Sequence, residues 1–378
     1  MVTRVYDIRD LLVPIPDYEP PPVQDMVADG PKPFEKPPTQ LEKDAEAERT
    51  RQAAVDRVEK LITETIEPPA WEKTAALREL QGQLIVTAPP RLHEQVTQLI
   101  DQLREARGIY VSVEARFLAV DDDVLDKLPP DLRRTVEGEL RAAKDPVRLG
   151  AGEVKPPDAA PAPPAKDASK AVVLDPAQVD QLLKAVQASA HSGVLTAPRI
   201  TLFNGQGGYV GTGTSRAYPA DYIVIKENDG QTRYEPQVAV VQAGVMFWAR
   251  ATAGADRTFA TLSLRPRLTQ LVGMDTVPWD RSPPDQKLTV QRPRLLASEL
   301  ATTVSVPNGK TLLMGGLKGY FGPEANAHNG AVVEAKAETK PQNVLLLVKP
   351  TLIIQREVEK PQFPLLKERK KDPQGNPH

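Results

Sequence analysis

The chain has no cysteine, few aromatic residues and no long apolar run. The absence of Cys from its 378 residues excludes disulfides, thiol nucleophiles and cysteine-ligated zinc or iron–sulfur sites. No segment approaches the roughly 20 apolar residues of a membrane-spanning helix, and no signal-peptide core precedes the first charges. Lys plus Arg number 48 against 50 Asp plus Glu, so no positive excess favours a nucleic-acid partner. We therefore expect a cytoplasmic protein or the downstream part of a longer exported one.

Proline, in contrast, is abundant, with 38 residues in the chain. Because proline lacks a backbone donor and stops helices and central strands, much of it must lie in linkers. The run from Pro14 to Pro38 predicts an extended or disordered connector, so residues 1–38 are expected to form an N-terminal segment and linker. Four apolar residues before this run predict a short element that docks elsewhere: Val5, Ile8, Leu11 and Leu12.

Residues 39–108 are expected to form a small α/β module. Gln83–Thr87 has the composition of a short strand. Apolar residues after it recur at helical spacing and predict an amphipathic helix that stops before Gly108. His93 falls on the side of this helix that we expect to be exposed, which favours a solvated surface residue over a metal ligand.

A well-alternating strand at Ile109–Phe117 opens the next region, which extends to residue 354. The polar, proline-containing stretch from Asp121 to about Asp175 predicts an interruption, with a disordered insertion near residues 144–172. Asp175 and the proline after it have the signature of a helix N-terminus. Residues 355–378 are expected to form a charged tail.

Alternating patterns predict that the remainder, up to residue 354, is dominated by strands. Val238–Arg250 and Phe259–Leu268 predict one long hairpin, whereas Gly273–Gln286 has the composition of a loop and Pro350 interrupts two apolar strands. Tight hairpin turns are predicted at three dipeptides whose residues tolerate a left-handed backbone: Asn204-Gly205, Asp229-Gly230 and Asn308-Gly309.

Several segments approach known catalytic or ligand-binding motifs but have the wrong spacing. In Gly205–Gly213, Val210 occupies the position of the third glycine of a dinucleotide fingerprint, and Pro219 excludes the helix that must follow. A glycine-rich turn between strands is the better interpretation. Gly309-Lys310-Thr311 lacks the first glycine of a phosphate loop, and Asp121–Asp123 lacks the spacing of a calcium loop. We therefore expect no enzyme activity, no cofactor and no metal site.

Four segments carry a family resemblance. Thr303–Leu317 is the most specific, with a strand, a Pro-Asn-Gly turn, a second strand and a Gly-Gly-Leu end. Val111–Phe117, Val194–Gln206 with the following Tyr209–Gly211, and Asn343–Ile354 accompany it in the family's order. Together they resemble the secretin family, the channel-forming outer-membrane proteins of type II and type III secretion systems, over about residues 109–354.

The resemblance implies an α+β fold. A small N-terminal α/β module, similar to ring-building domains, would precede a β-rich secretin-like domain, with proline-rich linkers. The residues expected to shape the family's turns and strand ends are Pro198, Asn204, Gly205, Gly211, Pro307, Asn308, Gly309, Thr311, Gly315, Gly316 and Pro350. The candidate residues of a barrel or gate hairpin are Val245, Phe247, Leu262 and Leu264.

By the same resemblance, the chain would be a subunit of a homo-oligomeric outer-membrane secretion channel. Its partners would be further copies in a many-copy ring, other secretion-system components, secreted proteins and a membrane. A chain without membrane helices can still cross a bilayer when many copies contribute strands to one closed β-barrel. The alternative is a non-channel structural or interaction module that keeps the fold without spanning the membrane. The lack of a visible signal peptide then marks the chain as a fragment or a soluble relative.

Overall fold

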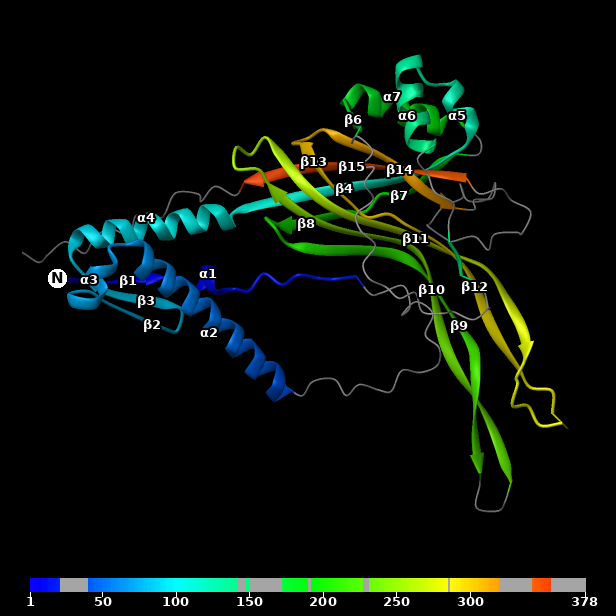
Figure 1. The fold of residues 1–378 in the computed structure, drawn as a ribbon, viewed down its shortest axis with the longest axis horizontal. Helices are drawn as coiled ribbons and strands as arrows, with labels where there is room; N and C mark the ends of the chain where they lie inside the picture. The colour runs from blue at the N-terminus through cyan, green and yellow to red at the C-terminus, as the bar shows by residue number, and fades with distance from the viewer. Residues whose placement is uncertain are drawn as a thin grey trace, which may run out of the picture.

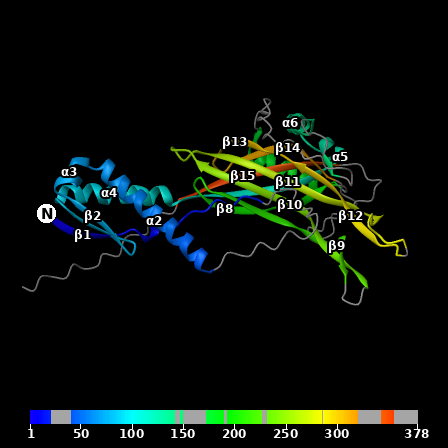
Figure 2. The ribbon, with the colours of Figure 1, turned by 60° about the horizontal axis from the view of Figure 1, so that its bottom comes forward.

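The computed structural model describes residues 1–20, 40–141, 147–149, 172–189, 192–226, 231–284, 286–319 and 342–354. These residues form a mixed α+β fold with three antiparallel sheets, which confirms the expected class. Figures 1 and 2 show a helix-containing module at the N-terminal end and an elongated β-rich part beyond it. No helix among the described residues is long and apolar enough to cross a membrane.

The N-terminal module combines a three-stranded sheet, in the order β1-β3-β2, with four helices. Its elements are β1 (Val2–Asp7), α1 (Arg9–Leu12), α2 (Gln40–Thr65), α3 (Pro68–Lys73), β2 (Ala76–Leu80), β3 (Gln83–Ala88) and α4 (Pro90–Arg107). The predicted strand and amphipathic helix are thus present as β3 and α4. The helix ends at Gly108, whose N–H donates to the carbonyl of Arg104.

The first residues of the chain complete this module. β1 pairs antiparallel with β3, and Ile8, Leu11 and Leu12 are buried in the module core. The prediction of a short docking element is therefore confirmed for these three residues and wrong for Val5, which is exposed on β1. β1 and α1 belong to the segment set apart above as residues 1–38, so the sheet joins that segment to the module.

His93 is fully buried, and its expected surface position is wrong. The hydroxyl of Tyr6 lies 2.9 Å from His93 Nδ1, and Nε2 lies 2.9 Å from the carbonyl oxygen of Val2. Both partners come from β1, which covers the side of α4 that the local pattern leaves polar. The histidine links strand and helix within the module.

The β-rich part contains two six-stranded sheets. The first, which we call the helix-covered sheet, has the order β6-β14-β15-β4-β7, and β8 also pairs with β4. Its strands are β4 (Ile109–Val120), β6 (Val172–Leu174), β7 (Gly193–Thr196), β8 (Arg199–Phe203), β14 (Thr311–Gly319) and β15 (Gln342–Ile354).

The second, which we call the hairpin sheet, has the order β5-β12-β11-β10-β9, and β13 also pairs with β11. Its strands are β5 (Val147–Leu149), β9 (Gly207–Lys226), β10 (Thr232–Ala253), β11 (Phe259–Pro278), β12 (Thr289–Glu299) and β13 (Thr302–Pro307). In Figure 1 the long strands of this sheet extend well past the helix-covered sheet.

The main core lies between the two sheets. Alternate residues of β4 face alternate residues of β10 and β11, and Phe117 meets Phe247 edge to face with ring centroids 6.3 Å apart. The alternation predicted for Ile109–Phe117 and for Ala260 to Leu268 is confirmed, because these apolar faces are buried here.

Three short helices cover the other face of the helix-covered sheet: α5 (Asp122–Asp126), α6 (Pro130–Arg141) and α7 (Pro176–Gln187). Asp175 and Gln178 form a capping box at α7, as the N-terminal signature predicted. The interruption expected from Asp121 onward is wrong as far as Arg141, because α5 and α6 bury Val124, Leu132 and Val136 against the sheet.

Four further expectations are corrected. β11 continues through Gly273 to Pro278, so only the last part of the predicted loop lies outside a strand. β15 runs through Pro350 without a break, and the glycine cluster is a turn only at Gly205, whereas Gly207 to Gly213 belong to β9. Val147–Leu149, inside the expected disordered insertion, pairs with β12. The rest of that insertion up to residue 171, the turn at Asp229-Gly230 and the charged tail lie outside the described residues.

Candidate functional site: motif turns and long hairpins

The Asn204-Gly205 turn connects β8 to β9 and bonds to both sheets. The Asn204 N–H donates to the carbonyl of Ile109 at 3.1 Å, and its Oδ1 accepts from the Ala253 N–H at 2.9 Å. Gly205 has φ of +86°, which favours glycine, and its N–H donates to the Ala251 carbonyl at 2.8 Å. The turn therefore fixes the start of β4 to the end of β10.

The Pro307-Asn308-Gly309 turn bridges the two sheets in the same way. The Asn308 N–H donates to the Thr258 carbonyl at 2.9 Å, and its Oδ1 accepts from the Leu352 N–H at 3.0 Å. Gly309 has φ of +76° and donates to the Pro350 carbonyl at 2.9 Å. Both Asn-Gly turns thus lie at the β10–β11 turn and hold the sheets together there.

The remaining motif residues lie along strands or at their ends. The carbonyl of Pro198 accepts from the Ala115 N–H at 2.9 Å, and Thr311 is buried at the start of β14. Gly211 lies in β9, opposite Met246 of β10. None of these residues forms a chemical site with another.

Gly315 and Gly316 form a bulge in β14, where the register against β15 shifts between Met314 and Leu317. Gly316 has φ of +108°. Glu139 of α6 lies directly over the bulge, and its Oε2 accepts from the Gly315 N–H at 3.1 Å. Burial raises the pKa of the Glu139 carboxyl, and the Gly315 hydrogen bond partly offsets this.

The four candidate hairpin residues all face the main core. Phe247, Leu262 and Leu264 are fully buried there, and Val245 packs against the same cluster. β10 and β11 pair as predicted, with Val245 opposite Leu268. The two strands are not an isolated ribbon, because β9 pairs with β10 while β12 and β13 pair with β11 in the same chain. Both strands of the hairpin therefore have neighbouring strands within a single copy.

The hairpin sheet splits into two hairpins at Gly244. Pairing between β10 and β11 ends at Gly244 opposite Thr269, while β10 continues with β9 and β11 with β12. Gly244 has φ of +155° and faces Gly213, and a Cβ on Gly244 would lie 2.2 Å from the Thr212 carbonyl oxygen. The glycine pair lets the β9 and β10 backbones approach closely at the point where the β9–β10 and β11–β12 hairpins separate.

Beyond the split, the two hairpins pack against each other through a small apolar cluster containing Tyr218, Val241, Leu271 and Leu295. A second cluster lies further out, and we call it the tip cluster: Asp221, Tyr222, Tyr234, Trp279 and Arg281. Trp279 Nε1 donates to Asp221 Oδ1 at 2.7 Å, and the Tyr222 hydroxyl donates to the Thr289 carbonyl at 3.2 Å. These contacts connect the tip of β9–β10 to that of β11–β12.

The opposite face of the β9–β10 hairpin is exposed and, along β10, uncharged. β10 carries no charged residue from Pro236 to Ala249, and Val238 and Val240 are exposed on it. β9 lies at the edge of the hairpin sheet, and none of the described strands lies beyond it. A long edge beside an uncharged, exposed face is a surface suited to another strand or to an apolar medium.

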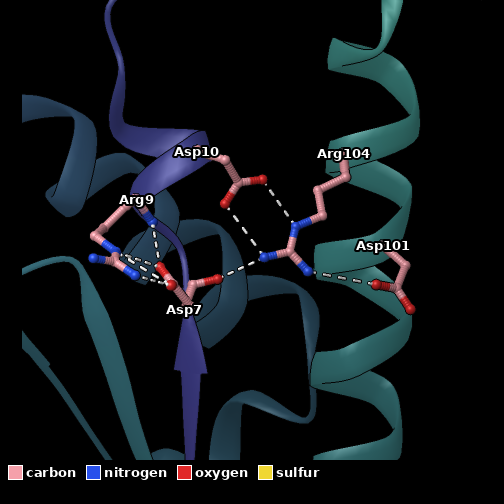
Figure 3. A network of polar contacts seen from close by, with 5 residues as sticks. All are labelled: Asp7, Arg9, Asp10, Asp101 and Arg104. Carbon is pink, nitrogen blue, oxygen red and sulfur yellow. Dashed lines mark hydrogen bonds and ion pairs between the residues drawn. The ribbon is translucent and has the colours of Figure 1, made fainter. Parts of the chain in front are cut away.

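A polar junction connects β1 and α1 to α4 (Figure 3). Arg104 donates to Asp10 at 2.9 Å and to the Asp7 carbonyl at 2.6 Å, and it pairs with Asp101 at 3.8 Å. Hydrogen bonds from Arg9 lower the pKa of Asp7 to about 2. Glu105 of the same helix pairs with Arg257 of the β10–β11 turn at 2.7 Å, so α4 also reaches the hairpin sheet.

No group of three or more metal-ligating side chains is found among the described residues. Sequence reasoning missed Gly213, Gly244 and Glu139. The glycines are visible in the sequence, but their position opposite each other depends on strand register. Glu139 has no local signal of burial, because the bulge that it covers lies far away in the chain.

No protein-family model and no curated protein matches the sequence. Among solved structures, a type II secretin, GspD of enteropathogenic Escherichia coli, matches with 13% identity and a TM-score of 0.32 over 80% of this chain and 84% of that chain. The competence pilus secretin PilQ of V. cholerae matches with 13% identity and a TM-score of 0.30 over 75% and 70%, respectively. The secretin domain of InvG from the Salmonella SPI-1 injectisome matches with 13% identity and a TM-score of 0.29 over 76% of each chain.

The solved structures that this chain resembles are secretins. Identities and TM-scores of this size transfer no residue roles, partners or activity.

Proposed function

We propose that this chain is one subunit of a homo-oligomeric, secretin-like channel of the outer membrane that takes part in protein secretion. The observation that carries the proposal is the β9–β10 hairpin. It extends beyond the main core between the two sheets, lies at the edge of its sheet and exposes Val238 and Val240 on a stretch of β10 without charges.

The physical argument begins with the edge of the sheet. A long edge strand left in water invites pairing with other chains, and closing many copies into a ring removes such edges. Within a bilayer, every backbone donor and acceptor must be satisfied, and closed sheets meet that requirement. Beyond the split at Gly244, the uncharged run Pro236–Ala243 has eight residues, close to the ~9–11 that a tilted strand needs to cross the hydrocarbon core.

The partners follow from this arrangement. Further copies of the chain would occupy the edge of β9, and lipid or a second wall would contact the exposed face. Other secretion-system components and secreted proteins are proposed as partners of the ring. The balance of 48 basic and 50 acidic residues gives no basis for binding nucleic acid.

A non-channel structural or interaction module that keeps the fold is the second candidate, and the tip cluster favours it. Trp279 and Asp221 hold the two hairpins together within one copy, so the hairpin faces that carry Tyr218 and Val241 are already covered. In this alternative the hairpins form a finished arm of a single chain.

Two valine variants separate the candidates: Val238→Asp in β10 and Val5→Asp in β1. They are a matched pair, because each replaces a strand valine that is 57% exposed. Neither change buries a charge in the single chain, so both variants should fold and melt like the wild type. In a channel, Val238→Asp places a carboxylate against lipid or a packed wall at a cost of about 2 kcal/mol or more. Val5→Asp places one on the surface of the N-terminal module.

The measurement is the yield of large, heat-resistant complexes after cell-free synthesis in the presence of liposomes. The channel proposal requires fewer complexes for Val238→Asp and a wild-type yield for Val5→Asp. Equal yields for both variants would contradict a role for the hairpin face. Monomers from the wild type as well would favour the interaction module.

A further inference from the structure

Residues 14–20, which we call the strap, lie along the start of the hairpin sheet. The sequence predicts an extended or disordered connector here, and these residues are extended. Figure 1 shows the strap leaving α1 and running toward β8 and β10. Pro14, Pro16 and Pro20 restrict its backbone, so little conformational freedom is lost when it binds in an extended form.

Tyr18 contributes its backbone to the contact. Its N–H donates to the Gly207 carbonyl at 3.0 Å, and its carbonyl accepts from Trp248 Nε1 at 2.9 Å. Gln206 Nε2 also donates to the Pro16 carbonyl at 2.8 Å. The strap therefore binds at the first residue of β9 much as an extended peptide binds to the edge of a sheet.

The acidic side chains of the strap meet basic partners. Asp17 Oδ1 accepts from the Gly207 N–H at 2.7 Å, and its Oδ2 accepts from an Arg250 guanidinium nitrogen at 2.9 Å. Glu19 lies 4.0 Å from the guanidinium of Arg265. Each acidic residue of the strap thus has an arginine of the hairpin sheet beside it.

The surface that receives the strap, which we call the Trp248 platform, consists of Gly207, Trp248, Arg250 and Arg265. The guanidinium carbons of Arg250 and Arg265 lie 5.7 and 5.0 Å from the centroid of the Trp248 ring. Gly207 makes room for both ring and strap, because a Cβ there would lie 3.1 Å from Trp248 Cζ2 and 3.3 Å from Asp17 Oδ1. An aromatic ring between two positive charges suits an acidic, extended ligand.

The strap adds a connection between the N-terminal module and the two packed sheets. The chain itself connects them where α4 passes into β4 at Gly108, and the exposed ion pair of Glu105 with Arg257 connects them at the β10–β11 turn. Just before the strap, the carbonyl of Val13 accepts a hydrogen bond from Arg107 at the end of α4. A module joined through one glycine and one exposed ion pair could pivot, whereas a module also held by the bound strap has a fixed orientation.

We propose that the Trp248 platform is a binding site for a short, extended acidic peptide. Residues 16–19 of the same chain are its resident ligand, and their binding sets the orientation of the N-terminal module. The site acts through opposite charges and backbone hydrogen bonds, so added salt weakens it. This inference stands independently of channel formation.

The test uses the full chain with Trp248 as its sole tryptophan, in a Trp71→Phe, Trp279→Phe background. In one variant, residues 16–20 are replaced by Gly-Ser-Gly-Ser-Gly, which keeps the chain length. Trp248 is 4% exposed with the strap in place. Release of the strap should raise its quenching by acrylamide several-fold and shift its emission to the red.

A synthetic peptide of residues 14–20 should restore protection when it is added to the replaced variant, and less so as salt increases. A peptide with Asp17→Asn and Glu19→Gln should fail to do so. Asp275→Asn is the matched control, because it breaks the exposed ion pair with Arg294 at 3.2 Å in the same sheet and should leave quenching unchanged. Wild-type quenching in the replaced variant would overturn the inference, and so would equal rescue by both peptides.

The proposed orientation needs a second readout. The chain has no cysteine, so spin labels at Gln98→Cys of α4 and Asp131→Cys of α6, both exposed, have no background. Their distance distribution should be narrow in the wild type and broaden when the strap is replaced. An unchanged distribution would refute the bracing role, whatever the chain's oligomeric state.

Discussion

Replacing Gly315 by alanine tests how the helices sit on the β-domain. Gly315 lies in the β14 bulge beneath α6, and a Cβ there would be 2.1 Å from the carbonyl oxygen of Glu139 and 2.6 Å from its carbonyl carbon. Both atoms are backbone, so no side-chain rotation relieves the clash. Gly315→Ala must therefore push α6 away from the helix-covered sheet or distort the bulge.

The cost follows from what α6 buries. Overpacking a well-packed contact costs about 1–3 kcal/mol when small shifts absorb it. If α6 separates instead, Leu132 and Val136 lose their burial, at about 1.5–3 kcal/mol each. We expect a loss of about 2 kcal/mol, which raises the population of opened α6 roughly 30-fold.

Amide hydrogen exchange in α6, followed by mass spectrometry on the full chain, measures this change. Gly211→Ala is the matched control, because the nearest atom to its new methyl group would be Met246 Cε at an ordinary 3.7 Å. That variant should change stability by less than about 0.5 kcal/mol. Exchange in α6 that is the same for Gly315→Ala, Gly211→Ala and the wild type would refute the reasoning.

Three further predictions concern single residues. Burial raises the pKa of the Glu139 carboxyl. Between its pKa in the unfolded chain and its pKa in the folded chain, the folded chain binds a proton that the unfolded chain has released. The contribution of Glu139 to the free energy of unfolding therefore falls as pH rises through this range. In urea unfolding at a series of pH values, Glu139→Gln should remove this decline in the free energy of unfolding. Glu137→Gln should instead remove an increase in that free energy with rising pH, because Arg133 lowers the pKa of Glu137. Gly309→Val should cost about 1–2 kcal/mol from backbone strain alone, since a Cβ there has no neighbour within 4 Å, and an unchanged melting temperature would contradict the left-handed turn. Val245→Asp should destabilise the single subunit by about 2 kcal/mol or more, because Val245 packs on the main core, and a folded variant that merely fails to form rings would place that residue elsewhere.

The periodicity of the sequence predicted elements whose partners are close by or whose faces are uniform. α4 and β4 follow from apolar spacing, and both Asn-Gly turns form with their glycines at the expected left-handed positions. The prediction that they are hairpin turns is wrong, because each joins a strand of one sheet to a strand of the other. His93 shows where local spacing is insufficient. The apolar spacing of α4 places His93 on the polar side of the helix. β1, which lies far from α4 in the sequence, covers that side.

Proline caused two of the wrong expectations, for physical reasons that local sequence does not reveal. Pro130 opens α6 at a position where a missing N–H costs nothing, so the proline marks a helix start rather than a linker. Pro350 lies within β15, and its carbonyl faces the N–H of Gly309 rather than a neighbouring strand. The position of its missing N–H therefore lies on the side where pairing with β14 stops at Val348, so no hydrogen bond between these strands is lost and β15 continues.

The central claim is that many copies of this chain close into one membrane-embedded ring. The most direct measurement is electron microscopy of the full chain synthesised in the presence of liposomes and recovered from the vesicle fraction of a flotation gradient. We predict closed rings whose wall is continuous from copy to copy along β9 and that hold together after the vesicles are dissolved in detergent. Single subunits that stay below the vesicles, each with its two hairpins packed together through Trp279, would contradict the claim.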